Sequence, residues 1–116
     1  MDRVCVVFPI LPGKTEAARA FQRELDTERK AEYARSERAI GITGEHWFLA
    51  SVPGGDQLVV YIESADFGRA IGQFGASQDA FDVWFKGRLA EVSGVDLGNL
   101  PPGMALPELV SSYEAA

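Results

Sequence analysis

The feature that most constrains the fold is a pair of apolar segments joined by a short glycine turn. Residues 42–52 and 57–63 are rich in β-branched and aromatic side chains, and the sequence PGGD separates them. Gly54 and Gly55 supply the positive φ angles that a tight hairpin needs. The pattern predicts two antiparallel strands that close symmetrically on these glycines, which sets His46 opposite Glu63 and Trp47 opposite Ile62.

The rest of the chain adds elements of both kinds around this hairpin. Apolar residues recur at helical spacing after Thr15, Asp66 and Asp79, each of which can cap a helix, and Gly94 stops the last one. The predicted elements are a buried strand over 3–10, a helix over 16–38 with a bend near Thr27, short helices from 66 and from 79, and a last strand over 108–113. The order β-α-β-β-α-β predicts a single ferredoxin-like α+β domain over 1–116, with a four-stranded antiparallel sheet.

Both faces of this sheet are rich in apolar residues. The segment VCVVF is apolar on both sides of its strand, and the hairpin places Phe48, Ala50 and Val59 on the face opposite Trp47. Helices can cover only one face, and an open face in contact with water should alternate with polar residues. A large exposed apolar face marks an interface. We therefore expect a homodimer in which two sheets pack face to face.

Four segments carry a resemblance to known proteins: SERAIGITGEHWFL, LVVYIES, DAFDVWFKGRLAEVSGVDL and PELVSSYEA. The layout is similar to the dimeric α/β barrel superfamily, which includes cofactor-free monooxygenases, muconolactone isomerases and haem-using enzymes. The segments more closely resemble a family of small uncharacterised bacterial proteins with this fold. The resemblance implies a dimeric α/β barrel but no particular reaction, since that family has no established activity.

The hairpin holds one candidate catalytic group, His46, which is the single histidine of the chain. A carboxylate at Glu63 could fix one imidazole tautomer and raise its basicity, as a general base requires. Tyr61 lies on the same predicted face and could donate a hydrogen bond. The alternative is a polar cross-strand pair at the end of a sheet, without a catalytic role.

A small-ligand site is predicted between the sheet and the helices. Trp47 and Trp84 are candidate pocket walls, and Tyr33 and Arg38 could place polar atoms at the mouth. The alternatives are core packing for the tryptophans and a solvated helix end for Tyr33 and Arg38. We expect no metal site, because one histidine beside two glutamates is not a ligand set, and no cofactor.

Composition excludes several classes of partner. The formal net charge of −6 argues against nucleic acid and against an anionic membrane surface. Cys5 is the single cysteine, so no intrachain disulfide can form, and its apolar neighbours are typical of a buried thiol. No signal peptide or membrane span is predicted, which makes a cytoplasmic protein the expectation.

Two functions are left open by the sequence. The first is a small-molecule-binding protein or a cofactor-independent enzyme, similar to a monooxygenase or an isomerase, that acts on an apolar or aromatic compound. The second is a non-catalytic dimeric interaction module with a filled core. A cavity beside a cluster of polar groups would favour the first.

Overall fold

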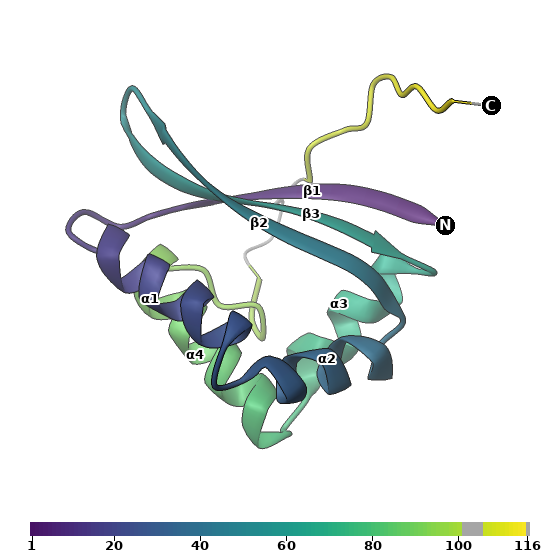
Figure 1. Ribbon diagram of the computed structural model, residues 1–116, viewed down its shortest axis with the longest axis horizontal. Coiled ribbons are helices and arrows are strands. Elements are labelled where there is room, and N and C mark those ends of the chain that lie inside the picture. The colour runs from purple at the N-terminus through teal and green to yellow at the C-terminus, as the bar shows by residue number, and fades with distance from the viewer. Residues whose placement is uncertain (101–105, 116) are drawn as a thin grey trace.

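The computed structural model describes residues 1–100 and 106–115, which form a sheet and a layer of helices (Figure 1). The strands in this part are β1 (Asp2–Pro9), β2 (Ile42–Val52) and β3 (Gly55–Ser64), and the helices are α1 (Thr15–Asp26), α2 (Lys30–Ala39), α3 (Phe67–Ala76) and α4 (Ala80–Ser93). The sheet is antiparallel in the order β1-β3-β2, and the helices lie on one of its faces. The predicted α+β class is confirmed.

The predicted fourth strand, over 108–113, is wrong for this chain on its own. Residues 106–115 have no regular secondary structure, and their side chains are exposed, with Tyr113 at 88%. Figure 1 shows the segment rising away from the sheet beside β1. Glu114, near its end, forms an ion pair with Arg3 of β1. A short strand is stable only when one of its faces is buried, and no other segment in the described part of the chain covers the side chains of residues 108–113.

Local signals set the helix ends much as the sequence indicates. The carboxylate of Asp66 accepts a hydrogen bond from the third N–H of the helix after it, and Asp79 accepts from two N–H groups of α4. Gly94 ends α4 with a φ of +76°. Thr15 was the wrong cap, because it is the first residue of α1 and its hydroxyl donates instead to Asp56 at 2.7 Å.

The bend predicted near Thr27 is a complete break between α1 and α2. Thr27 is the C-cap of α1, and α2 starts three residues later at Lys30. Because of this break, α2 runs along β2 while α1 packs against α4. The two halves of the predicted helix therefore cover different parts of the sheet.

The hairpin turn lies one residue earlier than predicted, which shifts the pairing partner of each β2 residue by two positions on β3. Val52 pairs with Gly55, so Pro53 and Gly54 form the turn, with a φ of +98° at Gly54. Proline fixes φ near its preferred negative value at the first turn position, and Gly54 supplies the positive φ at the second. A shift of two residues keeps every side chain on its predicted face but changes its partner.

The core lies between the inner face of the sheet and the helices. Trp47 and Leu49 of β2 point inward beside Val60 and Leu58 of β3. Rings from all four of these helices meet them there, with Phe85 of α4 at the centre of most of the aromatic contacts. The buried apolar side chains are Val6, Phe8, Ile10, Ala18, Phe21, Leu25, Leu58, Val60, Ile62, Phe67, Ala70, Phe74, Phe81, Phe85, Leu89 and Val92.

Candidate active site

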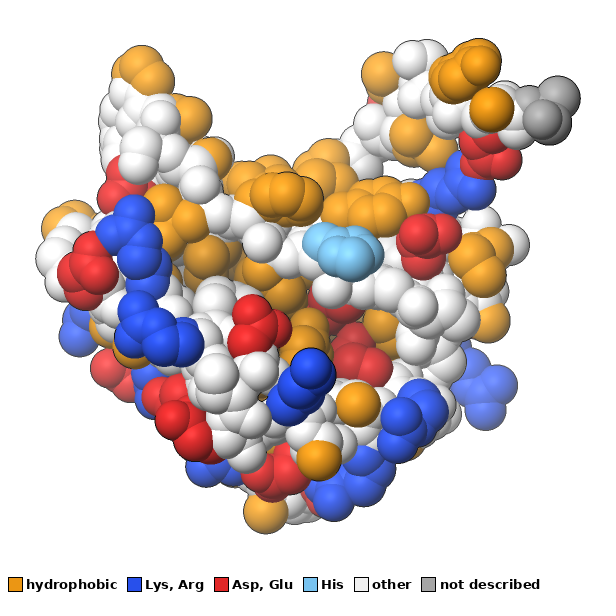
Figure 2. Space-filling view, in the orientation of Figure 1, with side chains coloured by type: hydrophobic (Ala, Val, Ile, Leu, Met, Phe, Trp, Pro, Cys, Tyr) orange, Lys and Arg blue, Asp and Glu red, His pale blue; other side chains and the backbone are white. Residues whose placement is uncertain are grey.

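A cavity of about 250 Å³ remains between the inner face of the sheet and helices α2, α3 and α4. Its walls are mostly aliphatic and aromatic, which is the usual lining of a small-molecule site. Figure 2 shows a hollow below the pale-blue histidine, with orange and red side chains inside it. The lining residues are Val6, Phe8, Glu37, Ile40, Ile42, Glu45, Trp47, Val60, Ile62, Phe67, Ala70, Ile71, Phe74, Phe85, Leu97, Leu100 and Leu106.

Two carboxyl groups stand out in this apolar lining. Glu45 alternates with Trp47 along β2, so the pleat of the strand turns it toward the helices. Its Oε2 accepts a hydrogen bond from Trp47 Nε1 at 3.0 Å and another from the Tyr33 hydroxyl. Trp47 Nε1 also lies 3.3 Å from the Tyr33 oxygen. Two donors on one oxygen are the surroundings that a carboxylate needs when it is removed from water.

The second carboxyl group, Glu37, comes from the helix above the sheet. Burial is the largest cause that raises its pKa, and together with the neighbouring charges of Glu45 and Asp82 and a hydrogen bond to Glu45 it brings the pKa to about 10. Its Oε2 is buried and has no donor in the described part of the chain. At neutral pH Glu37 is therefore a neutral acid, able to donate a proton or a hydrogen bond.

Tyr33 joins these two carboxyl groups to the helix layer. It lies one helical turn before Glu37 on α2, so the two side chains share a face of that helix. Burial and the neighbouring Glu45 raise the pKa of Tyr33 well above its ordinary value. The phenol stays protonated, and its hydroxyl donates to Glu45.

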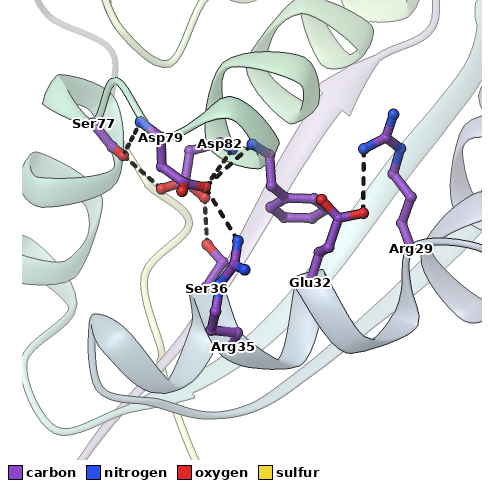
Figure 3. Close-up of polar contacts among 8 residues, drawn as sticks. Arg29, Glu32, Arg35, Ser36, Ser77, Asp79 and Asp82 are labelled. Atoms are coloured by element: carbon purple, nitrogen blue, oxygen red, sulfur yellow. Dashed lines mark hydrogen bonds and ion pairs between the residues drawn. The ribbon is translucent and has the colours of Figure 1, made fainter.

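The position of α2 over the cavity depends on a buried polar cluster at the other side of this helix. Asp82 of α4 accepts hydrogen bonds from Ser36 of α2 and, at 2.6 Å, from Ser77 (Figure 3). Nearby, Arg35 of α2 lies 3.6 Å from the carboxylate of Asp79. Since Ser36 directly precedes Glu37, these bonds fix the turn of α2 that presents the acid.

The predicted catalytic residues lie on the opposite face of the sheet, away from the cavity. His46 is exposed and pairs with Tyr61, not with Glu63, because of the shifted register. Glu63 lies opposite Gly44 at an irregularity in the strand and is 3.9 Å from Arg3. Among the described residues, no hydrogen bond or ion pair joins His46 to either partner. Their catalytic role stays a prediction.

The predicted ligand-binding residues divide into two pairs. Trp47 lines the cavity, and Tyr33 stands behind it as a donor to Glu45. Trp84 packs away from the cavity, with the Arg29 guanidinium 4.0 Å from its ring centroid. Arg38 is exposed at the end of α2. The first pair is brought together with the carboxyl groups, and the second pair is not.

Sequence reasoning missed Glu37 and Glu45, although the sequence carries a signal for each. Glu45 has the strand parity of Trp47 and Leu49, so it is an acid on the inner face of the sheet. Glu37 follows Tyr33 by four residues in the predicted helix. An acid with core parity needs a partner or a function. His46, the predicted catalytic residue, lies on the opposite face of the same strand.

The part of the chain that the structure describes contains neither a metal-binding cluster nor a membrane-spanning helix. No group of three or more His, Cys, Asp or Glu side chains there could hold a metal ion. No helix in residues 1–100 or 106–115 has both the length and the apolar character to cross a bilayer.

One solved structure is similar to this chain over its whole length. It is tetracenomycin F2 cyclase from Streptomyces glaucescens, a type-II polyketide cyclase, with 16% sequence identity, 100% of both chains covered and a TM-score of 0.58. At this identity the likeness shows the fold alone, and it supports the α+β arrangement with helices on one face of the sheet. No protein-family model and no curated protein match the sequence. The resemblance to a particular family stays a prediction.

Proposed function

We propose that this protein is a cofactor-independent enzyme that moves a proton within a small apolar or aromatic compound. The observation that carries the proposal is the pair of carboxyl groups at one end of an apolar cavity. Glu37 is a neutral acid there, and Glu45 accepts hydrogen bonds as a carboxylate does. A neutral acid beside a carboxyl group that accepts hydrogen bonds from two donors is the arrangement of a general acid beside a general base.

The chemistry follows from these two roles. Glu45 takes a proton from a carbon next to a carbonyl group, and the electron pair of that C–H bond moves toward the carbonyl oxygen. Glu37 donates its proton to that oxygen, which gives the enol. Return of a proton to a carbon regenerates a ketone, either the same one or an isomer, so atoms and charges balance without an oxidant. Chemistry of this kind is isomerase-like, and it fits a fold shared with a protein described as a cyclase.

The cavity favours this function over an interaction module with a filled core. A filled core would leave no space of about 250 Å³ beside buried acids. An interaction module also has no use for Glu37, because a buried neutral acid costs stability. Such a cost is usually found at sites where it serves binding or catalysis.

The homodimer belongs to the same proposal. Phe48 is 59% exposed on the outer face of the sheet, and Val7 and Val52 are 38% and 41% exposed there. Figure 2 shows orange side chains along the sheet between the hairpin tip and the C-terminal segment. We propose that a second copy covers this face, which leaves the cavity on the far side of each sheet free for a ligand.

Proton exchange tests the proposed chemistry directly. Wild-type protein in heavy water should speed deuterium uptake into a cyclic ketone such as β-tetralone, measured by the loss of its α-proton NMR signal. Glu45→Gln should slow this uptake by about a hundredfold or more, because it removes the base and keeps the shape. Glu91→Gln, an exposed glutamate on α4, is the matched control. Uptake that is equal in wild type and Glu45→Gln would refute the proposal.

A further inference from the structure

We infer that the cavity takes a neutral compound of one or two rings with a carbonyl group beside a C–H bond, an inference that rests on the proton transfer proposed above. Three features of the site carry it: the size of the cavity, the charges along its walls and the hydrogen bonds that Glu45 already receives. Each of them excludes a different class of compound.

The size of the cavity limits the number of rings. A cavity of roughly 150 Å³ lined by aliphatic and aromatic side chains is enough to bind benzene. The cavity here measures about 250 Å³. It has space for a second fused ring or for a ring with a short substituent. A planar compound of three or more fused rings would exceed this volume, and the buried residues Phe85 and Val60 close the inner end of the cavity.

The charges along the walls exclude acids. Glu37 and Glu45 are the only ionisable side chains among the described lining residues, so no lysine, arginine or histidine is present there to pair with an anion. Residues 101–105 lie outside the described part of the chain, and their sequence PPGMA contains no basic side chain. A carboxylate ligand would place a second negative charge beside Glu45 without compensation, and such burial is costly.

The hydrogen bonds at Glu45 argue against amines. Its Oε2 already accepts from Trp47 Nε1 and from the Tyr33 hydroxyl. A protonated amine could still reach Oε1 of Glu45, but it has three N–H donors and must leave water, and one carboxylate oxygen in an apolar cavity does not compensate for that. A carbonyl oxygen, in contrast, can take the hydrogen bond that the neutral Glu37 makes to Glu45, and it leaves the Trp47 and Tyr33 contacts in place. The polar groups of the site therefore match a ligand with a neutral hydrogen-bond acceptor.

A matched set of ligands tests the inference with the wild-type protein. Isothermal titration calorimetry at pH 7 compares β-tetralone, which is a neutral two-ring ketone, with the acid β-naphthoate, the amine aminotetralin and the three-ring ketone anthrone. We expect β-tetralone to bind at least about tenfold more tightly than each of the other three. Ile71→Trp, which fills the cavity, should abolish that binding, while Val83→Trp on the exposed side of α4 should not.

The outcomes separate this inference from the proposed function. Equal or tighter binding of β-naphthoate, aminotetralin or anthrone overturns the ligand class, even if deuterium uptake into β-tetralone is still fast. Selective binding of β-tetralone without faster uptake supports the ligand class and refutes the acid–base reaction. Binding of none of the four compounds overturns both.

Discussion

Replacing Glu37 with glutamine should make the protein more stable at neutral pH. The pKa of Glu37 is about 10 in the folded chain, against an ordinary value of 4.5. Between these values the unfolded chain releases a proton that the folded chain keeps. In this pH range the folded state binds more protons than the unfolded state, so the free energy of unfolding falls as the pH rises. Below the ordinary pKa of 4.5, Glu37 is protonated in both states and does not change the free energy of unfolding.

The magnitude follows from the two pKa values. One pKa unit corresponds to about 1.4 kcal/mol. A pH of 7 lies about 2.5 units above the ordinary pKa of Glu37, so the side chain is almost fully ionised in the unfolded chain. Keeping it neutral in the folded chain at this pH therefore costs about 3 kcal/mol. Glutamine has the shape of the neutral acid and still donates to Glu45, but it has no proton to release. The variant should therefore recover an amount of up to this size.

Urea unfolding at pH 5, 7 and 9 measures the effect, with tryptophan fluorescence as the signal and one protein concentration throughout. We expect Glu37→Gln and wild type to differ little at pH 5 and increasingly above it. Glu91→Gln, at an exposed position of α4, should follow wild type at every pH. A difference between Glu37→Gln and wild type that does not change with pH, or a variant that is less stable at pH 7, would show that Glu37 is not a buried neutral acid.

Three further changes test the other assignments. His46→Ala should leave deuterium uptake unchanged, because His46 lies on the outer face of the sheet, away from the cavity. Loss of uptake would return the chemistry to His46 and its predicted partners. Phe48→Glu should convert the dimer to a monomer in sedimentation velocity, with Val83→Glu as the exposed control. Identical sedimentation of wild type and Phe48→Glu would contradict the proposed interface. Asp82→Asn should lower the pKa of Glu37 in a carbon-detected NMR titration, because it removes a nearby negative charge. It should also destabilise the fold by about 1–3 kcal/mol, because it disturbs a buried hydrogen-bonded cluster. An unchanged titration of Glu37 would show that Asp82 acts only through stability.

The sequence determined the three strands of the sheet, the capped ends of α3 and α4, and the faces of the hairpin. Period-two alternation in β2 and β3 depends only on neighbouring residues, so Trp47 and Phe48 were assigned to opposite faces correctly. Asp66, Asp79 and Gly94 act within one helical turn, and each is where the sequence indicated. Signals of this kind need no knowledge of the rest of the molecule.

The register, the last strand and the site were decided by tertiary structure. A hairpin that closes on Pro53-Gly54 in place of Gly54-Gly55 preserves every face but moves His46 from Glu63 to Tyr61. The segment over 108–113 has strand-like residues but no surface in this chain that buries them. Glu37 and Glu45 come from a helix and a strand, and only the packing of α2 over β2 makes them neighbours in an apolar space. The strength of an acid depends on that space, which no local pattern in the sequence describes.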